Sequence, residues 1–400
     1  MFVLVLSADC FENDTPLKED KMKEEAEDPK QAVIQELAEC KDKENLNFIN
    51  AHFFSLPSQG NVYTLTPLTD AKGFTKILVA SLQRKVFCLE YTHGRPCMRD
   101  VPFTYIPGGA EIVSIDAVNR SIIQEDFIIG ITIIKKDDTT GQQSHFFNIY
   151  SDWDLNSDSA LDVVSQNCLP LELDFVPYHL YHTKTLGKNG WETVWLLSGS
   201  DCSIHLYQSD DESHSYQEVD GSQSFPEFKS VDGITLWMDI SYAQESKRDF
   251  ANAQKGFRLP ESDANDAVTC CIVCDIDQDG INEILIGTYG QVVLVYKWIQ
   301  KTSEWILYHT VSLPCPVLSL AYCDVMGDGT FQLIVMTSTG IHILQHDPWE
   351  MAKVLLHRIE AFMEPRLDKL HKKEPAQDPA HGPVQGPVDI EALGNNTSDE

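Results

Sequence analysis

The stretch CDIDQDGINEILIGTYGQVVLVYKW, residues 274–298, joins an acidic loop to two short apolar segments. The loop has the oxygen-rich spacing of a calcium loop, and the two segments have the composition of β-strands separated by a tight turn. A calcium loop of the EF-hand type needs a glutamate at its twelfth position and a helix on each side. Because this loop runs directly into a strand, the stretch predicts one unit of a repeated β-fold instead.

Three kinds of apolar segment recur along the chain in a fixed order. The first kind ends in an aspartate, in EIVSID, ITLWMD, TCCIVCD and LSLAYCD. The second kind ends in small residues, in KILVAS, FIIGIT, TVWLLSGS, EILIGT and QLIVMTS, and the third alternates, in KVFCLEY, FFNIYSDW, SIHLYQ, VVLVYKW and IHILQH. The last two copies place Asp275 and Asp324 about 49 residues apart, which is near the length of a propeller blade.

This order predicts an all-β fold, a β-propeller with FG-GAP-like or WD40-like blades. A small sheet with two apolar faces cannot fold alone, and packing several such sheets around an axis buries both faces and leaves only short edges. A β-sandwich would also contain alternating strands, but it would not require this ordered cycle of three segment types.

Composition divides the chain into four parts. Residues 1–46 are dominated by charge and predict a disordered acidic leader. Residues 47–346 hold the repeated strands of the propeller. Residues 347–373 carry apolar residues at three-to-four spacing and predict an amphipathic helix, which Pro365 interrupts. Residues 374–400 are rich in proline and glycine and predict an unfolded tail.

The repeat is incomplete around residues 242–265. After ITLWMDIS the cycle requires two more strands, but the polar stretch YAQESKRDFANAQKGFRLPESDAN follows instead. The sequence therefore predicts that strands of one blade are missing here, and a splice variant or an incomplete gene model is our hypothesis for their loss. Unpaired strand edges would make such a propeller fold poorly.

Charge and cysteine usage limit the function classes. The chain has 61 acidic and 30 basic residues, a formal net charge of -31, which argues against a basic groove for nucleic acid and against an anionic membrane surface. Eleven cysteines lie in apolar runs rather than in a spaced framework, a pattern typical of a reduced cytosolic protein. No run approaches eighteen apolar residues, and the short apolar start lacks a basic region, so neither a transmembrane segment nor a secretory signal is predicted.

The acidic loop is the candidate metal site. Its nine-residue form between two strands resembles the FG-GAP loops of integrin-type propellers, and its predicted calcium ligands are Asp275, Asp277, Asp279, the carbonyl of Ile281, and Glu283. An acidic turn that braces two strands without any metal fits the same residues and is the favoured interpretation. The corresponding loop of the next repeat, DVMGDGTFQ, has lost two of these acids, at Met326 and Gln332. In either case the loop would brace strands rather than catalyse.

Catalytic motifs are not found in the sequence, which holds no G-x-S-x-G, no H-E-x-x-H and no phosphate-binding loop. His179 and His182 lie three apart in a predicted strand and so face opposite sides, which favours core or surface histidines over metal ligands. Cys271 and Cys274 form a single C-x-x-C without a second pair, which favours buried thiols. The sequence therefore predicts a protein that is not an enzyme, with no cofactor unless calcium binds.

Several long blocks resemble the kaptin family, in order from about Phe53 to Phe362. They are SQGNVYTL, AEIVSIDAVNRS, FNIYSDW, LELDFVPYHLYH, ETVWLLSGSDCSIHLYQ, CDIDQDGINEILIGTYGQ and GIHILQH. Against the family pattern, this chain has an altered N-terminus and an internal deletion. The resemblance implies a propeller of about seven blades, one or more of them incomplete here, and it carries over no catalytic residue.

The resemblance also implies a function. Kaptin is a subunit of the KICSTOR scaffold, together with other subunits that include a second FG-GAP propeller protein. KICSTOR holds the GATOR complex at the lysosome and restrains TOR signalling when amino acids or glucose are scarce. The family is also associated with actin at lamellipodia and stereocilia. The expected location is therefore cytoplasmic, peripheral at the lysosomal membrane and at actin-rich structures.

Two other function classes stay open on the residues alone. A calcium-binding FG-GAP propeller of the adhesion type is the main alternative, against which count the cysteine pattern and the single intact acidic loop; calcium-dependent stability would favour it. A propeller hydrolase would need histidines and carboxylates that converge on the central channel.

Overall fold

The computed structural model describes residues 2–7, 46–121, 123–137, 139–152, 161–187, 190–210, 215–226, 228, 233–241, 259–300 and 302–371. The chain divides into two compact units, Met1–Asp347, which we term the propeller unit, and Pro348–Glu400.

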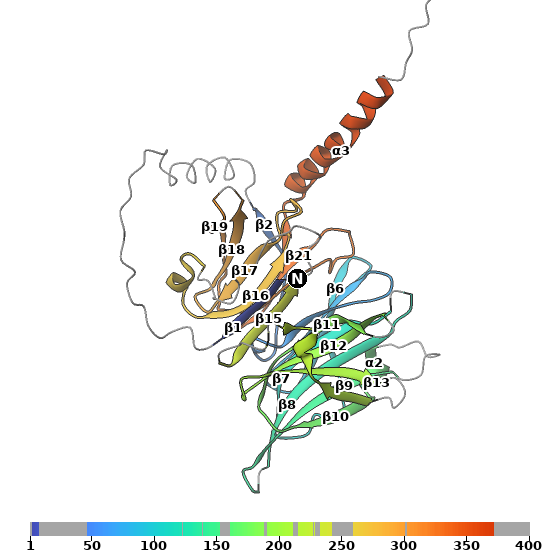
Figure 1. The fold of residues 1–400 in the computed structure, drawn as a ribbon, viewed down its shortest axis with the longest axis vertical. Helices are drawn as coiled ribbons and strands as arrows, with labels where there is room; N and C mark the ends of the chain where they lie inside the picture. The colour runs from blue at the N-terminus through green and yellow to red at the C-terminus, as the bar shows by residue number, and fades with distance from the viewer. Residues whose placement is uncertain are drawn as a thin grey trace, which may run out of the picture. The chain divides into compact units, whose positions relative to one another are not determined.

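The described strands of the propeller unit form five four-stranded antiparallel sheets and one two-stranded sheet (Figure 1). We name these sheets blades A to F in the order of their first strands. Blade A consists of β3 (Leu65–Thr69), β4 (Thr75–Ala80), β5 (Val86–Thr92) and β6 (Arg95–Val101). Blade B consists of β7 (Ala110–Asn119), β8 (Phe127–Lys136), β9 (Gln143–Ser151) and β10 (Cys168–Leu173). Blade C consists of β11 (Pro177–Gly187), β12 (Gly190–Gly199), β13 (Ile204–Asp210) and β14 (Ser215–Val219).

Blades D to F complete the set. Blade D consists of β15 (Thr235–Ser241) and β1 (Phe2–Ser7). Blade E consists of β16 (Val268–Cys274), β17 (Glu283–Thr288), β18 (Val292–Ile299) and β19 (Glu304–Ser312). Blade F consists of β20 (Val317–Cys323), β21 (Gln332–Thr337), β22 (Gly340–His346) and β2 (Phe48–Ser55). In the described part of the chain, short helices lie in the connections at α2 (Leu161–Val164), η1 (Gly221–Gln223) and η3 (Ser262–Asn265).

The first strands of the blades close a ring. Each contacts the next in the order β3, β7, β11, β15, β16 and β20, and β20 contacts β3 again. The predicted β-propeller is therefore confirmed, and the three segment types found in the sequence are the first, second and third strands of the blades. Among the described residues the ring has six positions, of which five hold four-stranded blades.

Hydrophobic clusters lie between neighbouring blades, as the ring arrangement requires. Between blades B and C, Phe147 and Trp195 are fully buried and meet edge to face, with ring centroids 5.9 Å apart. Each large apolar side chain buried in this way contributes about 1.5–3 kcal/mol to folding. The two-stranded blade D takes part on both sides, since Met238 joins the cluster with blade C and Trp237 the cluster with blade E.

Blade F is completed by a strand from far away in the sequence. Strand β2 pairs antiparallel with β22, from Phe48 opposite His346 to Ser55 opposite Gly340. Gly340 is required there, because a Cβ at this position would overlap the carbonyl oxygen of Phe54. Strand β2, from the start of the propeller, thus pairs with β22 at its end. This pairing covers the edge of β22, which would otherwise be open.

Blade D contains the largest differences from the sequence prediction. Strand β1 pairs with β15, with Phe2 opposite Ser241, although residues 1–46 were expected to be disordered. The apolar run FVLVL explains the difference, because it supplies strand-forming residues to the unpaired edge of β15. Residues 8–45 lie outside the described residues, as does 242–258, most of the segment in which strands were predicted to be missing.

Helix α3 (Pro348–His371) is the described part of the second unit. The sequence predicted a helix over residues 347–373 with an interruption at Pro365, but the helix continues through Pro365 without a break. One proline removes a single intrahelical hydrogen bond, and the remaining turns of this 24-residue helix are intact. No described helix is long and apolar enough to cross a membrane.

Candidate functional site

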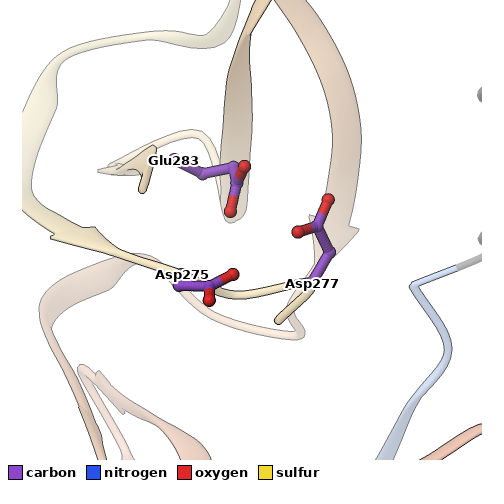
Figure 2. A group of neighbouring side chains, drawn as sticks. All are labelled: Asp275, Asp277 and Glu283. Atoms are coloured by element: carbon purple, nitrogen blue, oxygen red, sulfur yellow. The ribbon is translucent and has the colours of Figure 1, made fainter. Parts of the chain in front are cut away.

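The acidic loop between β16 and β17 brings three carboxylates together. Asp275 and Asp277 lie in the loop, and Glu283 is the first residue of β17. One oxygen of each lies within 4.8 Å of the others, and Figure 2 shows the three carboxylates turned toward a common space. Among the described residues this is the one group of three or more side chains with the geometry to hold a metal ion.

Backbone hydrogen bonds hold the loop in shape. Asp275 Oδ2 accepts from the amide of Gly280 at 2.9 Å, and Glu283 Oε2 accepts from the amide of Ile276 at 3.1 Å. Gly280 has a φ of 89°, in the left-handed region that favours glycine. The loop is therefore an ordered acidic turn, in which one oxygen of each of these two carboxylates accepts a hydrogen bond from a backbone amide.

A lysine from the neighbouring strand lies among the carboxylates. The Lys297 ammonium, on β18, forms an ion pair with Asp277 and lies 2.7 Å from Asp279 Oδ2 and 3.7 Å from Glu283 Oε1. The lysine side chain is 13% exposed. Sequence reasoning missed Lys297, although a single cation in the apolar strand VVLVYKW beside a loop of acids was the available signal.

The carboxylates have perturbed acidities. Burial, followed by the charge of Asp277, raises the pKa of Glu283 to about 9. Burial is also the main cause that raises the pKa of Asp275 and of Asp277. For Lys297, burial lowers the pKa, but hydrogen bonds to Asp277 and Asp279 outweigh it and raise the pKa above its usual value. The close carboxylates therefore disfavour one another's charge, and the one ammonium does not offset the burial of Glu283.

The predicted calcium ligands are only partly brought together. Asp275, Asp277 and Glu283 converge. Asp279 is not part of this group, and its carboxylate forms an ion pair with Lys297. Ile281, whose carbonyl was the predicted ligand, takes part in the loop through its backbone amide, which donates to Asp279 Oδ1 at 2.7 Å. The oxygen set fits a hard divalent cation, but the ammonium lies against the same oxygens, so calcium stays a prediction.

The corresponding loop of blade F has the same shape without the charge cluster. Asp324 accepts hydrogen bonds from the amides of Gly327 and Gly329, at 2.7 and 2.8 Å. Gln332 replaces the glutamate, and its Oε1 accepts from the amide of Val325 at 2.9 Å, as Glu283 does from Ile276. A neutral amide is thus sufficient to hold this turn.

The two histidines of β11 face opposite sides, as predicted. His182 Nδ1 lies 2.8 Å from Asp116 Oδ2 of blade B. His179 stacks on Trp237 of blade D, with ring centroids 4.3 Å apart, and its Nδ1 accepts from the amide of Met238 at 3.0 Å. Both histidines therefore serve packing between blades.

The C-x-x-C pair lies in β16. Both Cys271 and Cys274 are free thiols, Cys271 fully buried and Cys274 partly buried. Burial raises the pKa of both thiols well above the usual range, which keeps them protonated and unreactive.

Two aspartates of the first strands have a role that the sequence did not reveal. Asp239 on β15 accepts from the hydroxyl of Tyr181 in blade C at 3.0 Å and from the amide of Val273 in blade E at 2.9 Å. Asp116 likewise accepts from Thr66 of blade A at 2.9 Å and from His182 of blade C. These two side chains link neighbouring blades, whereas Asp275 and Asp324 begin acidic loops.

The fold and this site define a β-propeller protein with FG-GAP-like loops in adjacent blades, one with a glutamate (Glu283) and one with a glutamine (Gln332) at its ninth position. The chain belongs to the kaptin family, since the family model described as KICSTOR complex protein kaptin matches residues 48–255 and 251–356. It is similar to the mouse (Mus musculus) KICSTOR complex protein kaptin, with 30% identity over 397 aligned positions that cover 78% of this chain and 91% of the relative.

These comparisons bear on the incomplete blade. The two matched parts of the family model meet at residues 251–255, shortly after β15. The alignment with the mouse relative is 397 positions long, yet 78% of this 400-residue chain is only about 312 residues. The relative therefore carries residues with no counterpart here, while their place after β15 stays a prediction.

Proposed function

We propose that this chain is a non-enzymatic scaffold subunit of a KICSTOR complex, which recruits the GATOR complex to lysosomes and restrains TOR signalling when amino acids or glucose are scarce. The observation that carries the proposal is the kaptin family match, which spans the propeller and the start of α3. The partners would be the other KICSTOR subunits, among them a second FG-GAP propeller protein. The location would be cytoplasmic and, through the complex, peripheral at the lysosome.

The second unit supports a role in assembly. Helix α3 carries large apolar side chains that are exposed, among them Leu355, Leu356, Ile359 and Met363. An amphipathic helix binds a partner through anchors at three-to-four spacing. The net charge of -31 would in turn favour basic surfaces on the partners and speed association with them.

The test is affinity capture of the tagged full chain from cells that are starved of amino acids, followed by mass spectrometry. Recovery of the other KICSTOR subunits and of GATOR is expected. A double variant, Leu355→Glu with Ile359→Glu, should reduce recovery at least tenfold. The matched control on the same helix is His357→Gln with Glu360→Gln, which should retain it. Recovery of neither complex by the wild-type chain would contradict the proposal.

Actin binding is the second proposed function, supported by an apolar pair on the surface. Leu186 and Trp191 lie opposite each other at the end of the β11–β12 hairpin and are 73% and 66% exposed. An acidic protein can bind acidic actin filaments only through such a local apolar or basic patch. Cosedimentation with filaments should be lost in the Leu186→Ser, Trp191→Ser variant and retained in Leu82→Ser, another exposed apolar site. A wild-type chain that stays in the supernatant would contradict actin binding.

A further inference from the structure

The Lys297 ammonium lies where a bound cation would lie. It contacts Asp277 and Asp279 directly and approaches Glu283 Oε1 to 3.7 Å, from β18, the strand that pairs with β17. Asp277 and Glu283 also belong to the three carboxylates that could hold a divalent ion. A lysine side chain ends in a single charge on a flexible four-carbon stem, so the ammonium can leave such a position without any change in the backbone.

The ammonium does not satisfy the whole group. Glu283 is 0% exposed, and its Oε1 has no hydrogen-bond partner, because 3.7 Å from Lys297 Nζ exceeds hydrogen-bond distance. Asp275 Oδ1 is also buried without a hydrogen-bond partner. Both oxygens belong to the three carboxylates that converge in Figure 2. A buried polar atom that lacks a partner indicates an unmade interaction, here one with a cation.

We propose that the loop from Asp275 to Glu283 is an exchangeable cation site, in which the Lys297 ammonium is the resident cation and Ca²⁺ binds only by displacing it. The loop is then ordered without a metal, and calcium would use Asp275 Oδ1 and Glu283 Oε1, the two oxygens that the ammonium leaves unpaired. This inference does not rest on the scaffold function.

A comparison with blade F supports the pairing of Glu283 with Lys297. In the register of β17 and β18, Ile284 lies opposite Tyr296, which places Glu283 opposite Lys297. In blade F, Leu333 lies opposite Leu344, which places Gln332 opposite Gln345. The acid and the base of blade E are thus replaced together by two neutral amides in blade F. A cation is needed only where the acid is present.

The experiment measures calcium binding by calorimetry, and terbium binding by luminescence, on the full chain and on Lys297→Met. The variant removes the competing charge, so we expect calcium to bind at least tenfold more tightly than in the wild-type chain. Adding Glu283→Gln to Lys297→Met should abolish this gain. Lys85→Met is the control, because Lys85 forms an exposed ion pair with Asp100 in another blade. Equal calcium affinity in the wild-type chain and Lys297→Met would overturn the proposal, as would a gain that survives Glu283→Gln.

Thermal unfolding gives a second measurement, which also covers a variant that fails to fold. Without calcium, Lys297→Met should unfold at a lower temperature than the wild-type chain, and calcium should restore the difference. A chelator should leave the melting temperature of the wild-type chain unchanged. If the chelator destabilises the wild-type chain, calcium is the resident ion, and the proposal is wrong in favour of an adhesion-type calcium propeller. A destabilised Lys297→Met that calcium does not restore also overturns it.

Discussion

Asp116 accepts two hydrogen bonds from His182, one from its backbone amide at 2.5 Å and one from its Nδ1 at 2.8 Å. Asp116 lies on β7 and His182 on β11, so both bonds cross from blade B to blade C. The other oxygen of Asp116 accepts from Thr66 of blade A. One buried carboxylate thereby joins three successive blades, at a point where the ring has no continuous backbone pairing.

The substitution Asp116→Asn should lower the free energy of unfolding by about 2 kcal/mol. The amide keeps the size of the side chain but loses the charge and one of the two acceptors, which leaves buried donors without partners. Burial lowers the pKa of His182, while the charge and hydrogen bond of Asp116 outweigh it and raise the pKa. The pKa of His182 should therefore fall in this variant.

Chemical denaturation and the NMR titration of His182 check this prediction together. The control is Asp100→Asn, which breaks an ion pair whose two side chains are about half exposed and should cost less than about 1 kcal/mol. An Asp116→Asn chain as stable as the control, or an unchanged pKa of His182, would show that the link does not hold the blades together.

The contribution of His179 to stability should decrease as the pH falls from about 6.5 toward 4, whereas the raised pKa of Glu283 acts in the opposite direction. Burial lowers the pKa of His179 to about 4, whereas the unfolded chain keeps the ordinary value near 6.5. Between these values the unfolded chain binds a proton that the folded chain does not, so acid favours unfolding. One such histidine contributes about 2 kcal/mol of destabilisation at pH 5 relative to pH 7.

Urea unfolding at pH 7 and pH 5 measures this effect. His179→Gln should be less stable at pH 7, because it loses the stacking on Trp237, and its stability should lack the part of the pH dependence that comes from His179. His93→Asn, at an exposed turn with a positive φ that asparagine tolerates, should keep the full pH dependence. If the stability of His179→Gln has the same pH dependence as that of the wild-type chain, the effect comes from other groups. His346 is then the first candidate, since burial also lowers its pKa to about 4.

The local features of the fold could be predicted from the sequence, and the long-range features could not. Segments such as EILIGT and VVLVYKW carry their strand pattern and their order in a few residues, and that order defines the propeller. Strand β2 could not be assigned to blade F, because its pairing joins residues such as Asn50 and His342, which are 292 positions apart. The pairing of β1 with β15 escaped prediction for the same reason.

The candidate site shows the same division. The spacing of Asp275, Asp277 and Glu283 predicts a shared site, because those residues lie within one turn of chain. Lys297 comes from a different strand, and only the register of β17 and β18 places it there. The bridging roles of Asp116 and Asp239 depend on neighbouring blades, so the sequence could only group them with the other strand-ending aspartates.

The substitution Gly340→Ala should loosen β2. The added Cβ would overlap the carbonyl oxygen of Phe54 and lie within 2.9 Å of the ring of Phe53, so the closing strand must move. We expect a loss of about 2 kcal/mol, typical of overpacking at a well-packed position. Hydrogen exchange should become faster in β2 (Phe48–Ser55) more than in the other strands.

The control for this variant is Gly108→Ala. Its Cβ would meet only the end of a flexible side chain, Arg84 Nη1 at 3.7 Å, and it should be nearly neutral. Unchanged exchange of the β2 amides in Gly340→Ala would mean that the closure of the ring by β2 is not a weak point of the fold.

The loop of blade F has Gln332 in place of the glutamate, so the pairing of Glu283 with Lys297 can be rebuilt there. Gln332→Glu places a carboxylate at a position that is 0% exposed, without a cation opposite, and should cost about 3 kcal/mol. Adding Gln345→Lys, which lies opposite in the register, should recover more than half of this loss, because the new ammonium meets the new carboxylate as Lys297 meets Glu283. Gln345→Lys alone should change stability little, since its charge can turn toward water. Denaturation of the four chains gives the coupling energy directly. A coupling near zero would mean that the ammonium in blade E is not what makes Glu283 tolerable there.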